Sequence, residues 1–189
     1  MAKILAFAGS ARRDSANKKL LTALAAAARD AGGDVTQIDL ADFDIPLFNE
    51  DIESAGVPAD VTRLKKLAAD HDAFLISSPE YNGSISPLIK NTIDWLSRKH
   101  GDEPRMMAYS NKVVALSSAS PGGLGGIRML PQLQYIFQSL GVLVIPQTVA
   151  VGGAFKAFDE DGKLVDEKIQ ERVAAMAKRL VETTRALQK

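Results

Sequence analysis

Short apolar runs alternate with longer amphipathic stretches along this chain. The longer stretches repeat apolar residues every three or four positions, which predicts helices beginning near Asn17, Pro58, Pro87, Leu130 and Asp166. The short runs read as buried strands, the last of them closed by Pro146, at residues 3–8, 35–40, 73–78, 112–118 and 142–145. Regular alternation of strand and helix indicates an α/β fold in which helices cover both faces of a parallel sheet.

Five strands favour a flavodoxin-like three-layer sandwich with strand order 2-1-3-4-5 over a six-stranded dinucleotide fold. The length of 189 residues suits one domain, which we expect to cover residues 1–189. Residues 41–57 are polar and irregular, and residues 159–162 indicate the turn of a short hairpin.

The composition removes several classes of function. The chain carries 23 Lys and Arg against 23 Asp and Glu, so its zero net charge gives no reason to expect nucleic acid or a membrane as partner. It has no cysteine and two histidines, which excludes thiol chemistry and argues against a metal site. There is no signal-peptide pattern and no apolar run of about 18 residues, so we expect a cytoplasmic protein.

Three loops directly follow predicted strands, at residues 9–17, 79–83 and 122–126. In a parallel sheet all three emerge at the carboxyl edge, where ligands bind near the reversal of strand order. The first loop offers polar and charged groups, and the other two offer constrained backbone. Together they predict one site for a ligand with a phosphate at one end and a flat polar ring at the other.

The first loop offers groups that suit a phosphate. Ser10 and Ser15 supply hydroxyls, Asn17 an amide and Arg12 a guanidinium, and the following helix directs backbone amides at the loop. Alternatively, Ser15 and Asn17 only cap the helix and the arginines are solvated, with Arg13 the more solvent-facing of the two. The Walker and dinucleotide fingerprints are missing, which favours a terminal monophosphate.

The other two loops suit the ring. Pro79 and Gly83 constrain a turn with Tyr81 and Asn82 at its tip, whose backbone groups could meet the polar edge of an isoalloxazine, although an ordinary surface turn would look the same. The third loop has four glycines, which could let backbone approach a flat ligand or simply form a flexible connector. Arg128, just beyond, could bind a cofactor phosphate, pair across a subunit interface or be solvated.

As a group, these motifs resemble the NADPH-dependent FMN reductase family, whose members include bacterial quinone, chromate and azo-dye reductases. The resemblance covers roughly Ile4 to Val151 and implies a flavodoxin-like fold that binds FMN, with NADPH or NADH as co-substrate. Ser86-Pro87 departs from the proline–glycine pair of many relatives, which could alter acceptor preference. The matching motifs are Gly9-Ser10-x-Arg12-x-x-Ser15-x-Asn17, Pro79-Glu80-Tyr81-Asn82-Gly83-Ser84, Leu88-x-Lys90-Asn91-x-x-Asp94-Trp95 and the glycine loop.

The resemblance also assigns roles to residues. The first loop should hold the phosphate, while residues 79–83 and residues from 117 to 126 should line the ring. No catalytic side chain is expected, because the flavin carries the chemistry. The residues expected to bind the cofactor are Ser10, Arg12, Ser15, Ala16, Asn17, Pro79, Glu80, Tyr81, Asn82, Gly83, Ser117, Ser120, Gly122, Gly123, Gly125 and Gly126.

The predicted function is transfer of hydride from NADPH to bound FMN, and of electrons onward to a quinone, azo compound, chromate or free flavin by ping-pong exchange. A flavodoxin-type electron carrier is the alternative, although carriers tend to be acidic and this chain is neutral. A non-catalytic nucleotide-binding protein is a second alternative. Each can be distinguished by whether the protein binds FMN and oxidises NAD(P)H.

Relatives in this family are usually homodimers or dimers of dimers, so we expect a homodimer or homotetramer. The helix from Pro87 carries apolar residues on more than one face, beyond the single stripe of a surface helix. Trp95 on this helix is a candidate interface anchor, because aromatic residues are enriched at interface cores. The alternative is that Trp95 packs within its own subunit.

Overall fold

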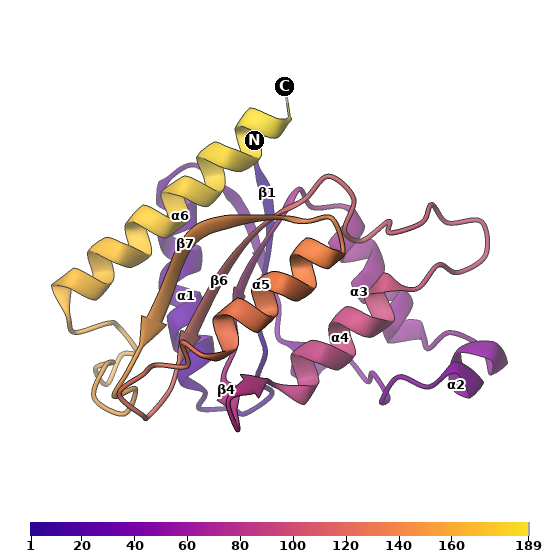
Figure 1. Cartoon of the computed structure of the whole chain (residues 1–189). Coiled ribbons are helices and arrows are strands. Elements are labelled where there is room, and N and C mark those ends of the chain that lie inside the picture. Colours follow the sequence, from indigo (N-terminus) through magenta and orange to yellow (C-terminus); the bar gives the residue numbers. More distant parts are fainter. Residues whose placement is uncertain (189) are drawn as a thin grey trace.

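The computed structural model describes residues 1–188, and its centre is a five-stranded parallel sheet between two helical layers (Figure 1). The strands pair in the order β2-β1-β3-β6-β7. Counting these five strands in chain order gives 2-1-3-4-5, so the predicted flavodoxin-like fold is confirmed. The strands are β1 (Lys3–Ala8), β2 (Asp34–Gln37), β3 (Ala73–Ser77), β6 (Val113–Ala119) and β7 (Leu143–Val151).

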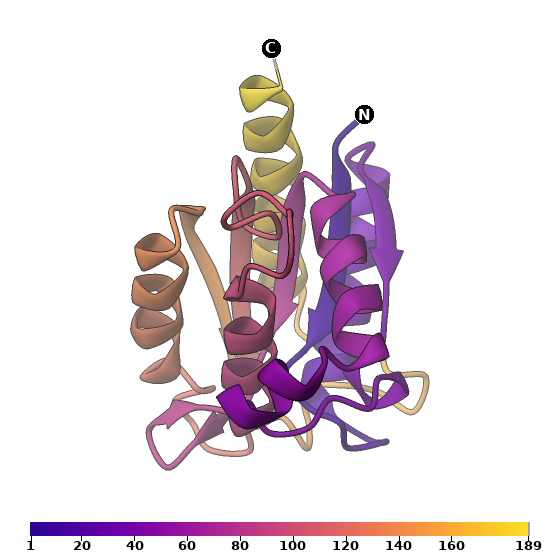
Figure 2. The same cartoon turned by 90° about the vertical axis from the view of Figure 1, so that its right-hand side faces the viewer.

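The central strands are apolar on both faces because helices cover both. On β1, Ile4 and Ala6 pack towards one layer, and Leu5 and Phe7 pack towards the other. Figure 2 shows the two layers on either side of the sheet. One layer consists of α1 (Ala16–Asp30) and α6 (Glu167–Leu187), and the other of α3 (Ala59–Ala69), α4 (Pro87–Ser97) and α5 (Met129–Ser139).

Most predicted helix starts agree with the structure. Ser86 precedes α4, its hydroxyl accepts a hydrogen bond from the Ile89 amide, and Pro87 occupies the first helical position. Asp166 caps α6 in the same way. The stretch 41–57 is less irregular than predicted, because it contains the short helix α2 (Glu50–Ala55) capped by Asn49.

The last strand was predicted too short. Instead of ending at Pro146, β7 continues to Val151, and its pairing with β6 shifts register between Val144 and Thr148. Pro146 is tolerated because β7 is an edge strand and the proline lies in this irregularity, where a missing N–H breaks no ladder bond. The second strand was predicted too long, since β2 ends at Gln37 and not at residue 40.

Trp95 is buried within its own chain, so the prediction of an interface anchor was wrong. Its Nε1 donates to the Pro46 carbonyl at 2.8 Å, and its ring meets that of Phe48 edge to face with centroids 5.0 Å apart. Asn91 binds the same segment, donating to the Pro46 carbonyl at 2.9 Å and accepting from the Phe48 amide at 2.7 Å. The Asn91 and Trp95 motif therefore anchors the segment that follows β2.

Neither a helix suited to crossing a bilayer nor a cluster of three or more potential metal ligands is found within residues 1–188.

Candidate functional site

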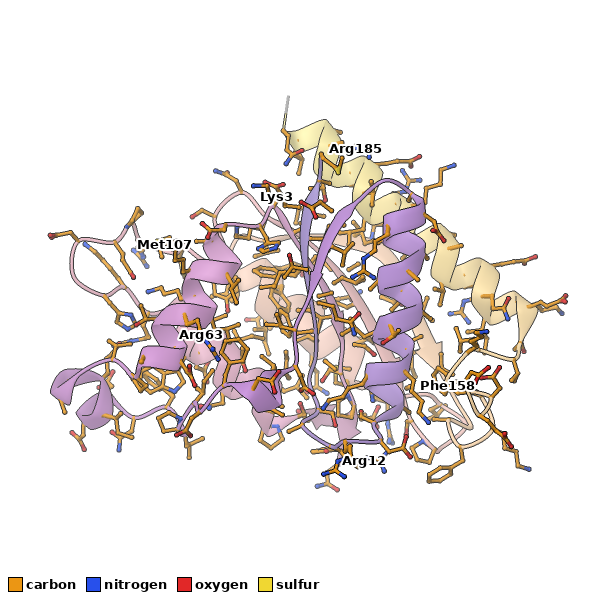
Figure 3. The ribbon with its side chains drawn as sticks, turned by 180° about the vertical axis from the view of Figure 1, so that it is seen from behind. Lys3, Arg12, Arg63, Met107, Phe158 and Arg185 are labelled. Atoms are coloured by element: carbon orange, nitrogen blue, oxygen red, sulfur yellow. The ribbon has the colours of Figure 1, made fainter. Side chains whose placement is uncertain are left out.

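A cleft of ≈ 300 Å³ opens at the carboxyl edge of the sheet, beyond the ends of β1, β3, β6 and β7. Here the strand order reverses about β1, which is where ligands of open α/β sheets bind. Figure 3 shows Arg12 and Phe158 at this edge, opposite Lys3 and Arg185. The cleft is lined by Ser10, Arg12, Asp14, Ser15, Ala16, Asn17, Lys19, Pro79, Glu80, Tyr81, Ala119, Ser120, Pro121, Ala154, Phe155 and Phe158.

One end of the cleft is formed by the loop between β1 and α1. Ser15 is the N-cap residue of α1, but its hydroxyl makes no capping hydrogen bond, and the first turn of the helix holds no acidic residue. The amides of this turn and the positive end of the helix are therefore directed at the cleft without a side-chain partner. Arg12 lines the cleft, whereas Arg13, which is also exposed, does not. This end suits a phosphate.

A second cation stands beside this end of the cleft. Lys19 lies one turn into α1 and pairs with the exposed Asp14 at 2.8 Å. The hydrogen bond and charge of Lys19 lower the pKa of the Asp14 carboxyl. The positive charge of Lys19 is therefore partly balanced, and Arg12 is the stronger candidate for contact with an anion.

Asn17 is not the N-cap of α1, and its side chain has a different task. It is the second residue of the helix and is buried. Its Nδ2 donates to the Ala119 carbonyl at 2.9 Å, and its Oδ1 accepts from the Ala119 amide at 2.9 Å and from Ser77 Oγ at 3.0 Å. The side chain thus joins α1 to the ends of β3 and β6. What Asn17 can offer to a phosphate is its backbone N–H.

The first and second loops are also joined at Gly9. The Gly9 amide donates to the Ser77 carbonyl at 2.9 Å, and its carbonyl accepts from Ser86 Oγ at 2.7 Å. A Cβ at this position would lie 2.4 Å from Ser78 Oγ, so only glycine allows this approach. Ser86 is buried and lies outside the cleft lining. Ser86, where many relatives have proline, therefore connects the segment before α4 to the loop after β1.

The other end of the cleft begins with a hairpin. β4 (Glu80–Tyr81) pairs antiparallel with β5 (Ser84–Ile85) across a two-residue turn. Asn82 and Gly83 both have positive φ, +52° and +79°, which is the type I′ geometry that Asn-Gly favours. This dipeptide was the available signal for the hairpin. Pro79, Glu80 and Tyr81 line the cleft, while Asn82 and Gly83 lie outside its lining.

Glu80 and Arg128 form an ion pair beside the hairpin. Arg128 Nε donates to the carboxylate at 2.7 Å and its backbone amide donates at 3.1 Å, while the Glu80 side chain is 6% exposed. These hydrogen bonds from Arg128 lower the pKa of Glu80, which keeps the carboxylate ionised. Arg128 thus pairs within its own chain while its side chain is 63% exposed, which agrees with the solvated alternative apart from the ion pair.

The glycine loop is packed against the protein itself. Gly125 and Gly126 have φ of +62° and +84°, and a Cβ would lie 2.7 Å from the Val151 backbone at Gly125 and 2.0 Å from Ser118 Oγ at Gly126. The exposed Gly122 and Gly123 lie outside the cleft lining. The close approach predicted for a ligand is therefore, at Gly125 and Gly126, an approach to neighbouring protein atoms.

The two predicted serines near the end of β6 differ in position. Ser117 is buried, and its hydroxyl donates to the Ile76 carbonyl at 3.1 Å. Ser120 lines the cleft. Of these two, only Ser120 can contact a ligand in the cleft.

The segment after β7 forms a wall that sequence reasoning missed. Gly153 and Ala154 donate backbone hydrogen bonds to Gly122 and Ser120 at 3.3 and 3.1 Å, and Phe155 and Phe158 line the cleft. It was missed because the strand was expected to end at Pro146. The signal was an apolar run followed by Gly152-Gly153, the same strand-to-loop pattern as at Gly9. The hairpin expected at residues 159–162 is present, since the Asp159 backbone amide donates to the Lys163 carbonyl at 2.9 Å.

These residues fit FMN. An uncapped helix start with hydroxyls and a guanidinium suits its phosphate. Pro79, Pro121 and the two phenylalanines offer apolar and aromatic walls, beside backbone polar groups, for a flat heterocycle.

Comparison with known proteins agrees with this geometry. The family model for NADPH-dependent FMN reductase matches residues 2–156. An NAD(P)H-dependent FMN reductase of Pseudomonas aeruginosa is 36% identical over 177 residues, covering 90% of this chain and 89% of the relative. A quinone reductase of Pseudomonas putida is 33% identical over 162 residues, covering 84% and 82%.

Solved structures give the same result. The flavoenzyme NAD(P)H:(acceptor) oxidoreductase FerB of Paracoccus denitrificans has a TM-score of 0.84 with 28% identity, over 98% of both chains. The resemblance inferred from the sequence motifs is thereby confirmed. The chain belongs to the NADPH-dependent FMN reductase family and is an oxidoreductase that uses FMN and NAD(P)H.

Proposed function

We propose that this protein oxidises NAD(P)H through FMN held in the carboxyl-edge cleft and reduces a small quinone. The observation that carries the proposal is the contrast between the ends of the cleft. An uncapped helix start with Arg12 faces one end, and the segment from Pro79 to Tyr81 lines the other, while Pro121, Phe155 and Phe158 add apolar lining. The quinone is supported by relatives such as the Pseudomonas putida quinone reductase.

FMN supplies the hydride-accepting and electron-donating chemistry when it is bound. The α1 amides and Arg12 bind and orient the phosphate, and the segment from Pro79 to Tyr81 forms one wall for the ring. Arg128 neutralises the Glu80 carboxylate, so that the charge beside the ring end is paired. In this proposal the side chains that line the cleft bind and orient the reactants.

We also propose that NAD(P)H and the acceptor use the cleft in turn. The lining residues form one opening of ≈ 300 Å³, and a shared opening predicts ping-pong kinetics. Double-reciprocal plots at several fixed quinone concentrations should be parallel, and intersecting lines would contradict the exchange. Azo compounds, chromate and free flavin are further acceptors to assay in the same way.

A homodimer or homotetramer remains our proposal for the assembly. Trp95 cannot anchor it, but large apolar side chains are exposed on the hairpin, the glycine loop and α5: Tyr81 by 51%, Leu124 by 59%, Ile127 by 51% and Tyr135 by 72%. These side chains are the candidates for such an interface, because exposed apolar surface can mark interaction sites. Light scattering on the flavin-loaded protein should give a multiple of the 20.3 kDa chain mass, and an active monomer would contradict the proposal.

The sharpest test of the binding mode compares the two neighbouring arginines. Arg12→Ala should raise the dissociation constant of FMN about tenfold, because a charge-assisted contact with phosphate is lost. Arg13→Ala is the matched control, since Arg13 is exposed outside the cleft lining. Equal affinities of both variants and the wild type would remove Arg12 from the phosphate site. Protein that binds no FMN at all would overturn the proposed function.

A further inference from the structure

The β4–β5 hairpin cannot hold its shape by pairing alone. It has two residues in each strand, and such short isolated hairpins are at best marginally stable. Burial holds it mainly at one residue, since Ile85 packs partly buried against the core, whereas Tyr81 and Asn82 are exposed. Contacts with other elements must therefore help to hold the hairpin in its position beside the cleft.

Two residues contact the hairpin at its two ends: Arg128, the N-cap of α5, and Gln132, within α5. Arg128, the residue before α5, binds the Glu80 carboxylate through Nε and the backbone amide, at 2.7 and 3.1 Å. Gln132 donates through Nε2 to the Gly83 carbonyl at 2.6 Å and accepts through Oε1 from Ser84 Oγ at 2.7 Å. Gln132 also donates to the Arg128 carbonyl at 3.3 Å, so the two residues lie on one side of the helix.

The glycine loop brings α5 close enough for these contacts. A Cβ placed on Gly126 would lie 3.5 Å from Glu80 Cβ as well as 2.0 Å from Ser118 Oγ. The missing side chain thus leaves space for Glu80 and for the end of β6. The hairpin and the glycine loop therefore pack against each other, through Glu80 and Gly126.

Arg128 and Gln132 lie outside the cleft lining, whereas Pro79, Glu80 and Tyr81 line it. Their contacts with the cleft lining are made through Glu80 and the hairpin, so we expect them to affect a ligand through the hairpin. We propose that Arg128 and Gln132 are positioning residues that fasten the β4–β5 hairpin to α5 and so set the affinity of the cleft for the flavin ring. This inference rests on the proposed function, because it takes the ring of FMN as the ligand of that end.

The test separates the ring from the phosphate by using two ligands. Riboflavin has the ring without the phosphate, and FMN has both. Arg128→Ala and Gln132→Ala should each raise the dissociation constants of both ligands about fivefold, because each loses hydrogen bonds that hold the hairpin. Arg12→Ala should weaken FMN and leave riboflavin unchanged. Quenching of flavin fluorescence measures each of these dissociation constants without turnover.

Two matched controls exclude a general effect of the substitutions. Gln138 is an exposed glutamine of the same helix, and Arg63 is an arginine paired with Asp60 on α3, away from the cleft. Gln138→Ala and Arg63→Ala should bind both ligands like the wild type. If Arg128→Ala and Gln132→Ala lowered only the melting temperature and left riboflavin affinity unchanged, the two residues would be merely structural and the proposal would fail.

A double-mutant cycle tests whether Arg128 acts through Glu80. In a Glu80→Gln background, Arg128→Ala should cost less riboflavin affinity than in the wild type, because the charged partner is already gone. If Arg128→Ala changed the riboflavin dissociation constant by the same factor in both backgrounds, the two residues would act independently and the coupling would be contradicted. The two proposals fail differently: wild-type protein that binds no flavin refutes the function, whereas wild-type protein that binds flavin but is indifferent to Arg128 and Gln132 refutes the positioning.

Discussion

The two ends of the cleft are built on different principles. The phosphate end is local, because residues 9–17 supply the loop, the helix start and Arg12 in one continuous stretch. The ring end is assembled from the hairpin at residues 80–85 and from Arg128 and Gln132, which are more than 40 residues further along the chain. An anion site can be encoded by a strand, a turn and a helix start, whereas a wall for a flat ring depends on how distant segments pack.

The largest expected effect tests the packing of the ring end. Gly126→Ala should lower the free energy of unfolding by about 3 kcal/mol, through a steric clash and a backbone conformation unfavourable to L-residues. The clash follows from the 2.0 Å between a Cβ at Gly126 and Ser118 Oγ, and φ is +84°. Gly123→Ala is the control, since nothing lies within 4 Å of a Cβ there. Urea unfolding curves with equal midpoints would show that the glycine loop is not packed as described.

The next effect concerns the joint between the phosphate end and the sheet. Asn17→Ala should cost about 2 kcal/mol of unfolding free energy, because the Ala119 amide and carbonyl lose buried hydrogen bonds. Thr22→Ala on the exposed side of the same helix should cost far less. If Asn17→Ala instead left stability intact and abolished FMN binding, the side chain would be a ligand contact and the role given to it here would be wrong.

The third prediction distinguishes the two ends by pH. Glu80 has a folded pKa below its ordinary value of 4.5 because of Arg128, so its stabilising effect is complete above pH 4.5 and is lost as the pH falls through the folded pKa. The stability difference between wild type and Glu80→Gln should therefore be largest near neutrality and shrink in acid.

At the phosphate end, Lys19 likewise lowers the pKa of Asp14, but the Asp14 side chain is 78% exposed. Asp14→Asn should give a smaller difference over the same pH range, since solvent screens an exposed pair. Unfolding free energies measured from pH 3 to 7 on both variants check the contrast. A larger effect at Asp14 than at Glu80 would reverse the comparison.

The smallest expected change is at the wall formed after β7. Phe155 is 80% exposed, so Phe155→Ala should alter the unfolding free energy by less than about 0.5 kcal/mol. It should nevertheless weaken FMN about threefold, because an aromatic surface of the cleft is lost. Parallel calorimetric scans and flavin titrations would measure both quantities. Unchanged FMN affinity would exclude Phe155 from the flavin site.

The same contrast explains how far sequence reasoning reached. The parallel sheet, its strand order and the cleft-lining positions of Ser10, Arg12 and Ser15 follow from local patterns of apolar runs and loop chemistry. The joining role of Asn17 could not be predicted, because its partner Ala119 lies 102 residues away. The wall at Phe155 and Phe158 was missed through one local error, the assumption that a proline ends an edge strand.

The Asn91 and Trp95 motif teaches a related lesson. A pattern carried by a family can be recognised in a sequence without revealing whether it binds a ligand, joins subunits or holds a loop. Here both side chains bind the carbonyl of Pro46, which is distant in sequence and has no distinctive signature. Only the tertiary structure identifies that partner.

The most direct test of the central claim is an anaerobic absorbance titration of the FMN-loaded protein with NADPH, followed by addition of a quinone. We predict that the visible absorption band of the oxidised flavin bleaches with one equivalent of NADPH and returns when the quinone is added. A flavin-loaded protein whose band persists in excess NADPH would contradict the account and indicate a carrier that needs a separate reductase.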